Sequence, residues 1–214
     1  MIEWLTTPLW VLGSYAMTRL EAITTVLALI GIWFNTRQSL WAWPVNIAAI
    51  LLSMALFAVN RIYGDMALQI YFLVASLYGW YAWLHGAKVE DSMLQARPLT
   101  VSCLSKSQWL ILLMIWGMLW VVLYQLLARH TNTDVPSLDG MTTAGSIIAQ
   151  VLLARKKIEN WLLWFVVDVV YVGLYLIKSL WLTAGLYGVF LLLCMLGWQR
   201  WRADQQARGN VVLA

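Results

Sequence analysis

The sequence NWLLWFVVDVVYVGLYLIKSL, residues 160–180, is apolar enough to lie in a lipid bilayer, yet it carries a carboxylate, Asp168, near its middle. A charged side chain at the membrane centre costs about 2.5 to 3.5 kcal/mol on insertion scales, so Asp168 is expected to face a cavity or a partner instead of lipid. If this segment is helical, two indoles and two phenols lie on the same face as Asp168: Trp161, Trp164, Tyr171 and Tyr175. This column suits a flat, polar small molecule, including a cationic one.

The composition of the whole chain predicts an all-α integral membrane protein. Of its 214 residues, 62% are hydrophobic and 11% are charged, so a soluble domain would expose more apolar surface than water tolerates. A helix needs about 20 apolar residues to cross a hydrocarbon core of about 30 Å. Seven spans are predicted, at residues 20–35, 40–59, 63–83, 108–127, 138–154, 160–177 and 181–201.

The first apolar segment of the chain is short for a membrane-spanning helix. Residues 4–15 contain Pro8 and Gly13 and lack the basic start and small-residue cleavage site of a signal peptide. We expect an interfacial helix here, with an eighth span as the alternative.

The distribution of Lys and Arg predicts the orientation. One side of the membrane receives Arg37, Lys88, Arg97, Lys106, Arg155, Lys156, Lys157, Arg200, Arg202 and Arg208, and the other receives only Arg19, Arg61, Arg129 and Lys178. The richer side is expected to be cytoplasmic, which places the C-terminus inside and the N-terminus outside. The net charge of +4 follows from this topology, and no basic face suggests nucleic-acid binding. Two cysteines and two distant histidines indicate neither a disulfide nor a metal site, and no cofactor is expected.

The chain repeats itself at a shift of 118 residues. The shift superposes Thr24-Thr25 on Thr142-Thr143, Arg37 on Arg155, Trp43 on Trp161, Gly79-Trp80 on Gly197-Trp198 and Trp83 on Trp201. Three spans per unit and one joining span give both copies the same orientation, a 3+1+3 arrangement of parallel repeats that resembles the sugar-carrying SWEET proteins, with a site expected between the halves near the midplane. The predicted parts are an interfacial segment at 1–18, a first repeat at 19–87, a loop and connecting helix at 88–130, a second repeat at 131–202 and a cytoplasmic tail at 203–214.

Three stretches resemble the PnuC-type nicotinamide riboside transporters. They are WAWPVN at residues 41–46, LQIYF at 68–72 followed by YGW at 78–80, and ENWLLW at 159–164 followed by Asp168. The resemblance, which covers residues 21–201, implies a 3+1+3 homotrimer in the bacterial inner membrane that takes up nicotinamide riboside passively. It also implies a cytosolic riboside kinase that traps the substrate by phosphorylation. One departure is Asp168, which stands where a relative of known structure has Asn.

The chemistry of the residues agrees with this substrate. Nicotinamide riboside is a pyridinium with a carboxamide and a ribose, and an indole face attracts such a ring by about 0.5 to 2 kcal/mol. Trp164 is the first candidate for this contact and Trp161 the second. Asp168 would offset the positive charge or accept hydrogen bonds from ribose hydroxyls, and pairing with a neighbouring helix is the structural alternative.

Amide side chains are candidates for the carboxamide and the ribose, because an amide donates and accepts hydrogen bonds at once. These are Gln69, Asn46 and Gln150, with Tyr71 and Tyr171 shaping the cavity. Interhelical hydrogen bonding or ordinary core packing is the alternative for each. Phosphorylated analogues are expected to bind poorly, because no Lys or Arg lies in the middle of a predicted span.

Three functions are therefore open. A facilitator of nicotinamide riboside uptake is favoured over an ion-coupled symporter of another vitamin or nucleoside, such as thiamine or riboflavin, in which Asp168 would titrate or bind the ion. An intramembrane enzyme is least favoured, because the spans offer no paired catalytic carboxylates, His-rich metal set or Ser and Lys dyad.

Overall fold

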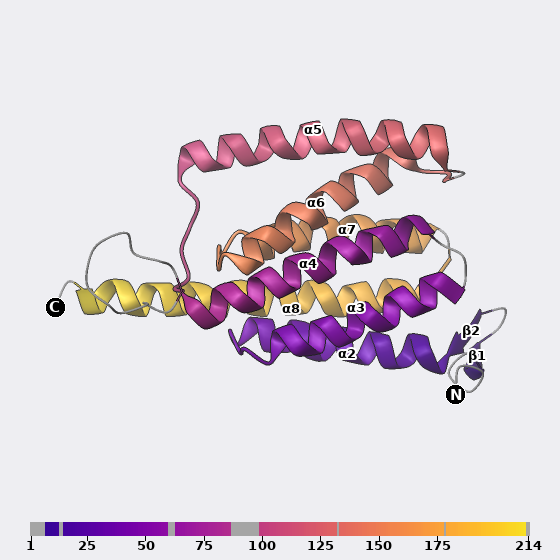
Figure 1. Ribbon diagram of the computed structural model, residues 1–214, viewed down its shortest axis with the longest axis horizontal. Helices are drawn as coiled ribbons and strands as arrows, with labels where there is room; N and C mark the ends of the chain where they lie inside the picture. Colours follow the sequence, from indigo (N-terminus) through magenta and orange to yellow (C-terminus); the bar gives the residue numbers. More distant parts are fainter. Residues whose placement is uncertain are drawn as a thin grey trace. The chain divides into compact units, whose positions relative to one another are not determined.

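The computed structural model describes residues 7–12, 15–59, 63–86, 99–131, 133–177 and 179–212. These residues form seven helices and two short strands (Figure 1). The elements are β1 (Pro8–Leu12), β2 (Tyr15–Thr18), α2 (Arg19–Thr36), α3 (Ala42–Val59), α4 (Tyr63–His85), α5 (Lys106–His130), α6 (Pro136–Ala154), α7 (Asn160–Ile177) and α8 (Trp181–Val212). The chain divides into two compact units, Met1–Leu84 and His85–Ala214.

Each of the seven predicted segments is helical, and α7 begins and ends at the predicted residues. Among the described residues, four helices are long and apolar enough to cross a membrane: Met66–His85, Lys106–His130, Asn160–Ile177 and Trp181–Arg208. Residues Ala42–Ala58 of α3 form a shorter apolar helix. The architecture is thus an all-helical, multi-pass one, and seven full crossings stay a prediction.

The prediction of an N-terminal helix is wrong. The chain there forms an antiparallel hairpin, in which Val11 pairs with Ala16 and Leu12 pairs with Tyr15. In the sequence the two strands are separated only by Gly13 and Ser14, a dipeptide typical of two-residue hairpin connections. The flanking Trp, Val, Leu and Tyr residues also favour strands, so the local signal outweighs the apolar character that suggested an interfacial helix.

Unit 1 is held together by close contacts of two glycines with larger side chains. α2 packs on α3, and a Cβ atom at Gly31 would lie 1.8 Å from Oδ1 of Asn46, so only glycine lets these helices approach so closely. α3 contacts α4 through Trp43, whose ring packs edge to face on Trp83 with centroids 5.2 Å apart. A Cβ atom at Gly79 would lie 2.1 Å from the Trp43 ring.

Unit 2 is a series of neighbouring helices in which α5 packs on α6, α6 on α7, and α7 on α8. α6 is the most buried of them, with small residues such as Gly140 and Gly145 where its neighbours come near. Two indoles of α5 fix it to α6: Trp116 Nε1 donates to the Met141 carbonyl at 3.1 Å, and Trp120 Nε1 to the Ser137 carbonyl at 2.9 Å. α5, predicted as a connecting helix, therefore belongs to this unit.

A short segment before α5, residues 101–105, runs along the turn between α6 and α7, and we call it the strap. Its backbone exchanges hydrogen bonds with that turn: Ser102 N donates to the Lys156 carbonyl, and Ile158 N donates to the Ser102 carbonyl, both at 3.1 Å. Glu159, only 4% exposed, accepts from Leu104 N through Oε1 at 2.7 Å. The carboxylate thus anchors the strap at the start of α7.

Replacing Glu159 by Ala is expected to lower the free energy of unfolding by about 1.5 to 3 kcal/mol, because the Leu104 amide loses a hydrogen bond to a charged group. Thermal unfolding in detergent measures the loss. The matched control is Asp204→Ala, which removes a carboxylate from an exposed i,i+4 ion pair with Arg208 and should cost less than about 1 kcal/mol. Equal melting temperatures for the two variants would show that the strap is not anchored by Glu159.

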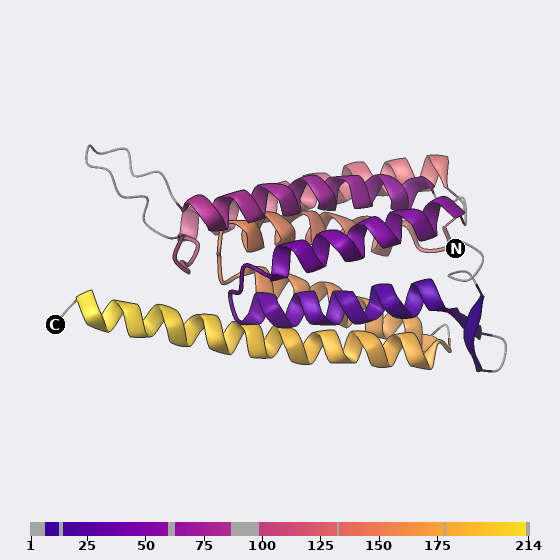
Figure 2. The ribbon, with the colours of Figure 1, turned by 60° about the horizontal axis from the view of Figure 1, so that its bottom comes forward.

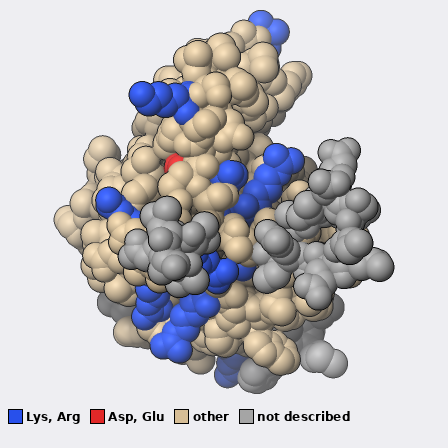
Figure 3. Space-filling model, turned by 90° about the vertical axis from the view of Figure 1, so that its left-hand side faces the viewer, with Lys and Arg blue, Asp and Glu red and all other residues tan. Residues whose placement is uncertain are grey.

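The predicted tail at 203–214 is not separate from the last span, because α8 continues as one helix to Val212 (Figure 2). Arg208 Nε and Asp204 Oδ2, 3.1 Å apart, support this extension, and Gln205 Nε2 contacts Cys103 Sγ of the strap at 3.1 Å. Burial, together with the nearby charge of Arg208, lowers the pKa of Lys156. Lys and Arg side chains are frequent on the face viewed from this end, and little acidic surface is seen there (Figure 3).

Candidate functional site

The helix α7 has one face inside unit 2 and one face outside it. Trp161, Leu163, Val167 and Asp168 are buried, whereas Leu162, Val166, Val169 and Leu176 are between 37% and 46% exposed. The predicted stripe lies on the covered side: Asp168 is buried, and Trp164, Tyr171 and Tyr175 are half-buried. The carboxylate therefore faces protein, as its cost in lipid requires.

Asp168 is 5% exposed and lies midway along α7. Its Oδ2 atom accepts a hydrogen bond from the thiol of Cys194 in α8, with Sγ and Oδ2 3.6 Å apart. A thiol is a weak donor, so this contact orients the carboxylate without neutralising it. Among the described residues, Cys194 is the one side-chain donor to this carboxylate.

The two indoles of the stripe have different neighbours. Trp164 packs against a hydrophobic cluster of α5, α6 and α7 that contains Leu112, Ile148 and Leu163. Trp161, 3% exposed, instead packs edge to face on Trp201 of α8, with ring centroids 5.5 Å apart. Its Nε1 atom is buried and has no hydrogen-bond acceptor among the described residues.

The same local arrangement occurs at the matching positions of unit 1. Trp161 lies over Gly197, where a Cβ atom would be 2.4 Å from the ring, just as Trp43 lies over Gly79. Trp43 also packs edge to face on a second indole, and its Nε1 atom likewise has no acceptor among the described residues. In each unit a glycine on one helix thus positions an indole of another.

Beyond Asp168, α7 continues into a cluster of aromatic rings. Tyr171 and Tyr175 stack with centroids 6.0 Å apart, and Tyr187 of α8 lies 4.9 Å from Tyr171 and 5.2 Å from Tyr175. Phe190 packs edge to face on Tyr187 at 5.3 Å. Tyr171 is therefore part of a packed aromatic wall next to the carboxylate.

The predicted amides are found in both units. Gln150 is 7% exposed on α6, on the same buried face as Thr142 and Ser146. The Thr142 hydroxyl donates to the Leu138 carbonyl of its own helix at 3.0 Å, which accounts for that residue by packing.

In unit 1, three further candidates are half-buried. Asn46 lies against Gly31 at the contact of α3 with α2, which supports the structural alternative for this residue. Gln69 lies on α4, and Tyr71 packs edge to face on Phe72 with centroids 5.5 Å apart.

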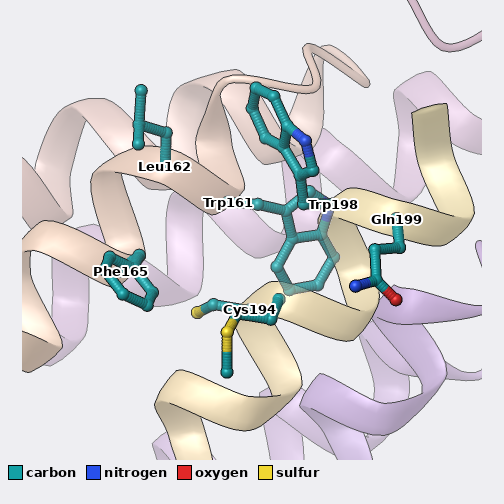
Figure 4. A pocket seen from close by; sticks show the side chains of 7 residues that line it. Trp161, Leu162, Phe165, Cys194, Trp198 and Gln199 are labelled. Atoms are coloured by element: carbon teal, nitrogen blue, oxygen red, sulfur yellow. The ribbon is translucent and has the colours of Figure 1, made fainter.

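A cavity of about 260 Å³ lies between α7 and α8, lined by Trp161, Leu162, Phe165, Cys194, Met195, Trp198 and Gln199 (Figure 4). Of the predicted recognition residues, Trp161 lines this cavity, whereas Trp164 and Asp168 do not. Leu162 and Met195 are 41% and 43% exposed, which places the mouth of the cavity on the outer surface of unit 2. Within the described residues, no group of three or more His, Cys, Asp or Glu is placed to hold a metal ion.

Sequence reasoning missed two residues of this region. These are Cys194 and Tyr187, neither of which is among the predicted site residues. Both lie on α8, and their nearness to Asp168 and Tyr171 depends on how α8 packs on α7. The repeat could have indicated that Cys194 is buried, because Cys194 aligns with Ser76, which is fully buried in unit 1.

The fold defines a polytopic helical membrane protein. By comparison with known families, the chain belongs to the nicotinamide mononucleotide transporter family, whose model matches residues 18–203. It is therefore a multi-pass membrane protein of a transporter family and not an enzyme.

Three relatives illustrate the similarity. The nicotinamide riboside transporter PnuC of Escherichia coli is 23% identical over 223 residues, with 94% of this chain and 92% of the relative covered. The riboflavin/roseoflavin transporter RibM of Streptomyces davaonensis is 26% identical over 201 residues, with the same coverage. The crystal structure of the vitamin B3 transporter PnuC superposes with a TM-score of 0.68 at 21% identity, covering 88% of this chain and 82% of that one.

Proposed function

We propose that the protein mediates uptake of nicotinamide riboside by facilitated diffusion, with phosphorylation inside the cell trapping the substrate. The observation that carries this proposal is Asp168, a carboxylate that is 5% exposed within an apolar helix of a transporter-family chain. The riboside has a fixed positive charge, and a carboxylate attracts a cation more strongly in a low-dielectric interior than in water. Its weak partner, Cys194, leaves this attraction available.

The roles of the site residues follow from their chemistry and surroundings. Trp164 stacks on the pyridinium, and the Trp161 Nε1 atom, which lacks an acceptor in the described chain, donates to a ligand oxygen. Gln69, Gln150 and Asn46 supply amides, with Asn46 the weakest candidate because its side chain already contacts Gly31. Tyr71 and Tyr171 line the proposed substrate-binding cavity, which is not the cavity between α7 and α8.

The nucleoside is preferred over the nucleotide. The Lys and Arg residues of the described helices lie near the ends of the apolar stretches, as Arg19, Lys106, Arg129 and Arg200 illustrate. A phosphate would thus meet the Asp168 carboxylate without a compensating cation, and like charges brought together discriminate against the wrong ligand.

A binding panel on the purified protein tests this proposal, with nicotinamide riboside, nicotinamide mononucleotide, riboflavin and thiamine as ligands. The riboside is expected to bind most tightly, and Trp164→Ala should weaken it by about 2- to 30-fold, the range of one cation–π contact. The matched control is Val166→Ala, because Val166 is 37% exposed on the other face of α7. Tighter binding of the mononucleotide or of neutral riboflavin would contradict the proposal.

A transport measurement distinguishes facilitated diffusion from the alternative, ion-coupled transport. Uptake into proteoliposomes without an internal kinase should stop at the external concentration, with or without a proton or sodium gradient. Accumulation above that level would identify a symporter instead.

We also propose two parallel three-helix repeats with one connecting helix, a homotrimer, and a cytoplasmic C-terminus in the bacterial inner membrane. The matching Trp43, Gly79 and Trp161, Gly197 contacts support the duplication. The Lys and Arg bias supports the orientation, although Arg61, Lys88, Arg97 and Lys178 lie outside the described residues. Labelling of Cys103, which is exposed, tests this orientation: a thiol reagent should reach it from the cytoplasmic side of the membrane and not from the outside.

A further inference from the structure

The cavity between α7 and α8 contains one of the proposed recognition residues, Trp161, but the roles proposed for Trp164 and Asp168 do not involve it. Its lining is mainly apolar, the polar groups being the Gln199 amide, the Cys194 thiol and the indole N–H groups of Trp161 and Trp198, and it opens where Leu162 and Met195 are exposed. In a multi-pass membrane protein, apolar side chains exposed on a membrane-spanning helix contact lipid or another subunit. Its volume of about 260 Å³ is below the roughly 300–1,000 Å³ of typical small-molecule pockets, and suits part of a linear chain.

The groove changes from apolar to basic along α8. Met195, Trp198, Gln199 and Arg202 recur at spacings of three and four residues, so they form one stripe of the helix. Figure 4 shows Leu162 and Phe165 along α7 and Trp198 and Gln199 along α8. Arg202, which is exposed, comes one turn beyond, so the order along the stripe is apolar surface, indole, amide and guanidinium.

From this order we infer that the α7–α8 groove binds an anionic phospholipid, with one acyl chain against Leu162, Phe165 and Met195 and the phosphate beside Arg202. Tryptophan is typical of the membrane interface, where Trp198 would meet the ester region, and basic groups at a membrane surface attract anionic head groups. Among the described residues at this end, Asp204 pairs with Arg208, and Glu159 accepts from Leu104 N through Oε1, while its Oε2 atom has no partner. Arg202 is exposed and makes no ion pair with the described residues, so its guanidinium is accessible to a lipid phosphate.

The inference has a consequence for the neighbouring carboxylate. Cys194 lines the groove and donates to Asp168, so a chain lying in the groove contacts the residue that orients this carboxylate. The lipid groove shares Trp161 with the proposed substrate site but includes neither Trp164 nor Asp168, and lipid binding is measured without substrate.

Native mass spectrometry of the purified full-length protein tests the inference, with phosphatidylglycerol and phosphatidylcholine of identical acyl chains as the probes. Phosphatidylglycerol should bind more tightly, and Arg202→Gln should weaken it about fivefold, the contribution of one basic side chain near a membrane surface. Arg129→Gln is the matched control, because it removes an exposed guanidinium from the far end of α5. Met195→Trp, which fills the groove, should reduce the binding of both lipids.

Two results would overturn the inference. Equal binding of the two lipids, unchanged in Arg202→Gln, would show that no head-group site exists. Loss of the oligomer in Met195→Trp without loss of lipid would show that the groove is occupied by a second copy of this chain. Arg202→Gln changes an exposed side chain, so a folding failure in the groove-filling variant would not prevent the test.

Discussion

Replacing Asp168 by Ala is expected to lower the affinity of the purified protein for nicotinamide riboside at least tenfold. A hydrogen bond or close contact with a charged group contributes about 1.5 to 3 kcal/mol, which corresponds to about 10- to 150-fold in affinity. The affinity of Asp168→Asn should lie between those of the unaltered protein and Asp168→Ala, because an amide keeps an acceptor for the Cys194 thiol but not the charge. Isothermal titration of the three proteins measures the series.

Stability separates this role from a structural one. A charge in a membrane helix is costly, so removing it should leave the melting temperature unchanged or raise it if Asp168 serves recognition. If Asp168 instead pairs structurally, Asp168→Ala should melt lower, because a broken buried pair destabilises the fold. A variant that binds riboside normally, or that loses stability together with binding, would contradict the proposed role.

The second large effect is expected from a single methyl group on α8. Gly197→Ala would place its Cβ atom 2.4 Å from the Trp161 ring, and such overpacking costs about 1 to 3 kcal/mol. The ring cannot retreat easily, because Trp201 packs against it edge to face. We expect a clearly lower melting temperature in detergent, and the same for Gly79→Ala, whose Cβ atom would lie 2.1 Å from Trp43.

Gly188→Ala is the matched control on the same helix. No heavy atom lies within 4 Å of the added Cβ atom, so the change should be neutral or slightly stabilising through helix propensity. Equal melting temperatures for Gly197→Ala and Gly188→Ala would show that the glycine does not position the indole.

The helices could be predicted because each depends on a long apolar run of its own. α7 is the clearest case, since Asn160 and Ile177 end it in both the sequence prediction and the structure. The hairpin of β1 and β2 could not be predicted from hydropathy, because an apolar segment as short as residues 4–15 can form either a helix or strands. The extension of α8 was missed because the hydropathy signal ends near Trp201, whereas backbone helicity continues through polar residues to Val212.

The site could be predicted only in part, for a physical reason. Helical periodicity places Trp161, Trp164 and Asp168 on one stripe, but the partner of each side chain depends on which helix packs against it. The structure thus separates neighbours on that stripe: Trp164 faces the α5 and α6 cluster, whereas Asp168 meets Cys194 of α8. The shared Gly-Trp-x-x-Trp pattern pointed to Gly197 and Trp201 but not to their contact with Trp161.

The helix α8 is longer than the hydrocarbon core of a membrane is thick. Its 32 residues span about 48 Å at 1.5 Å per residue, whereas the hydrocarbon core is about 30 Å thick. A continuous helix without proline links Cys194 beside the buried carboxylate to Gln205 at the strap. If binding of the proposed substrate tilts α8 near Asp168, we expect the Lys- and Arg-rich end of the helix to move with it, and a spectroscopic probe attached there would detect the movement.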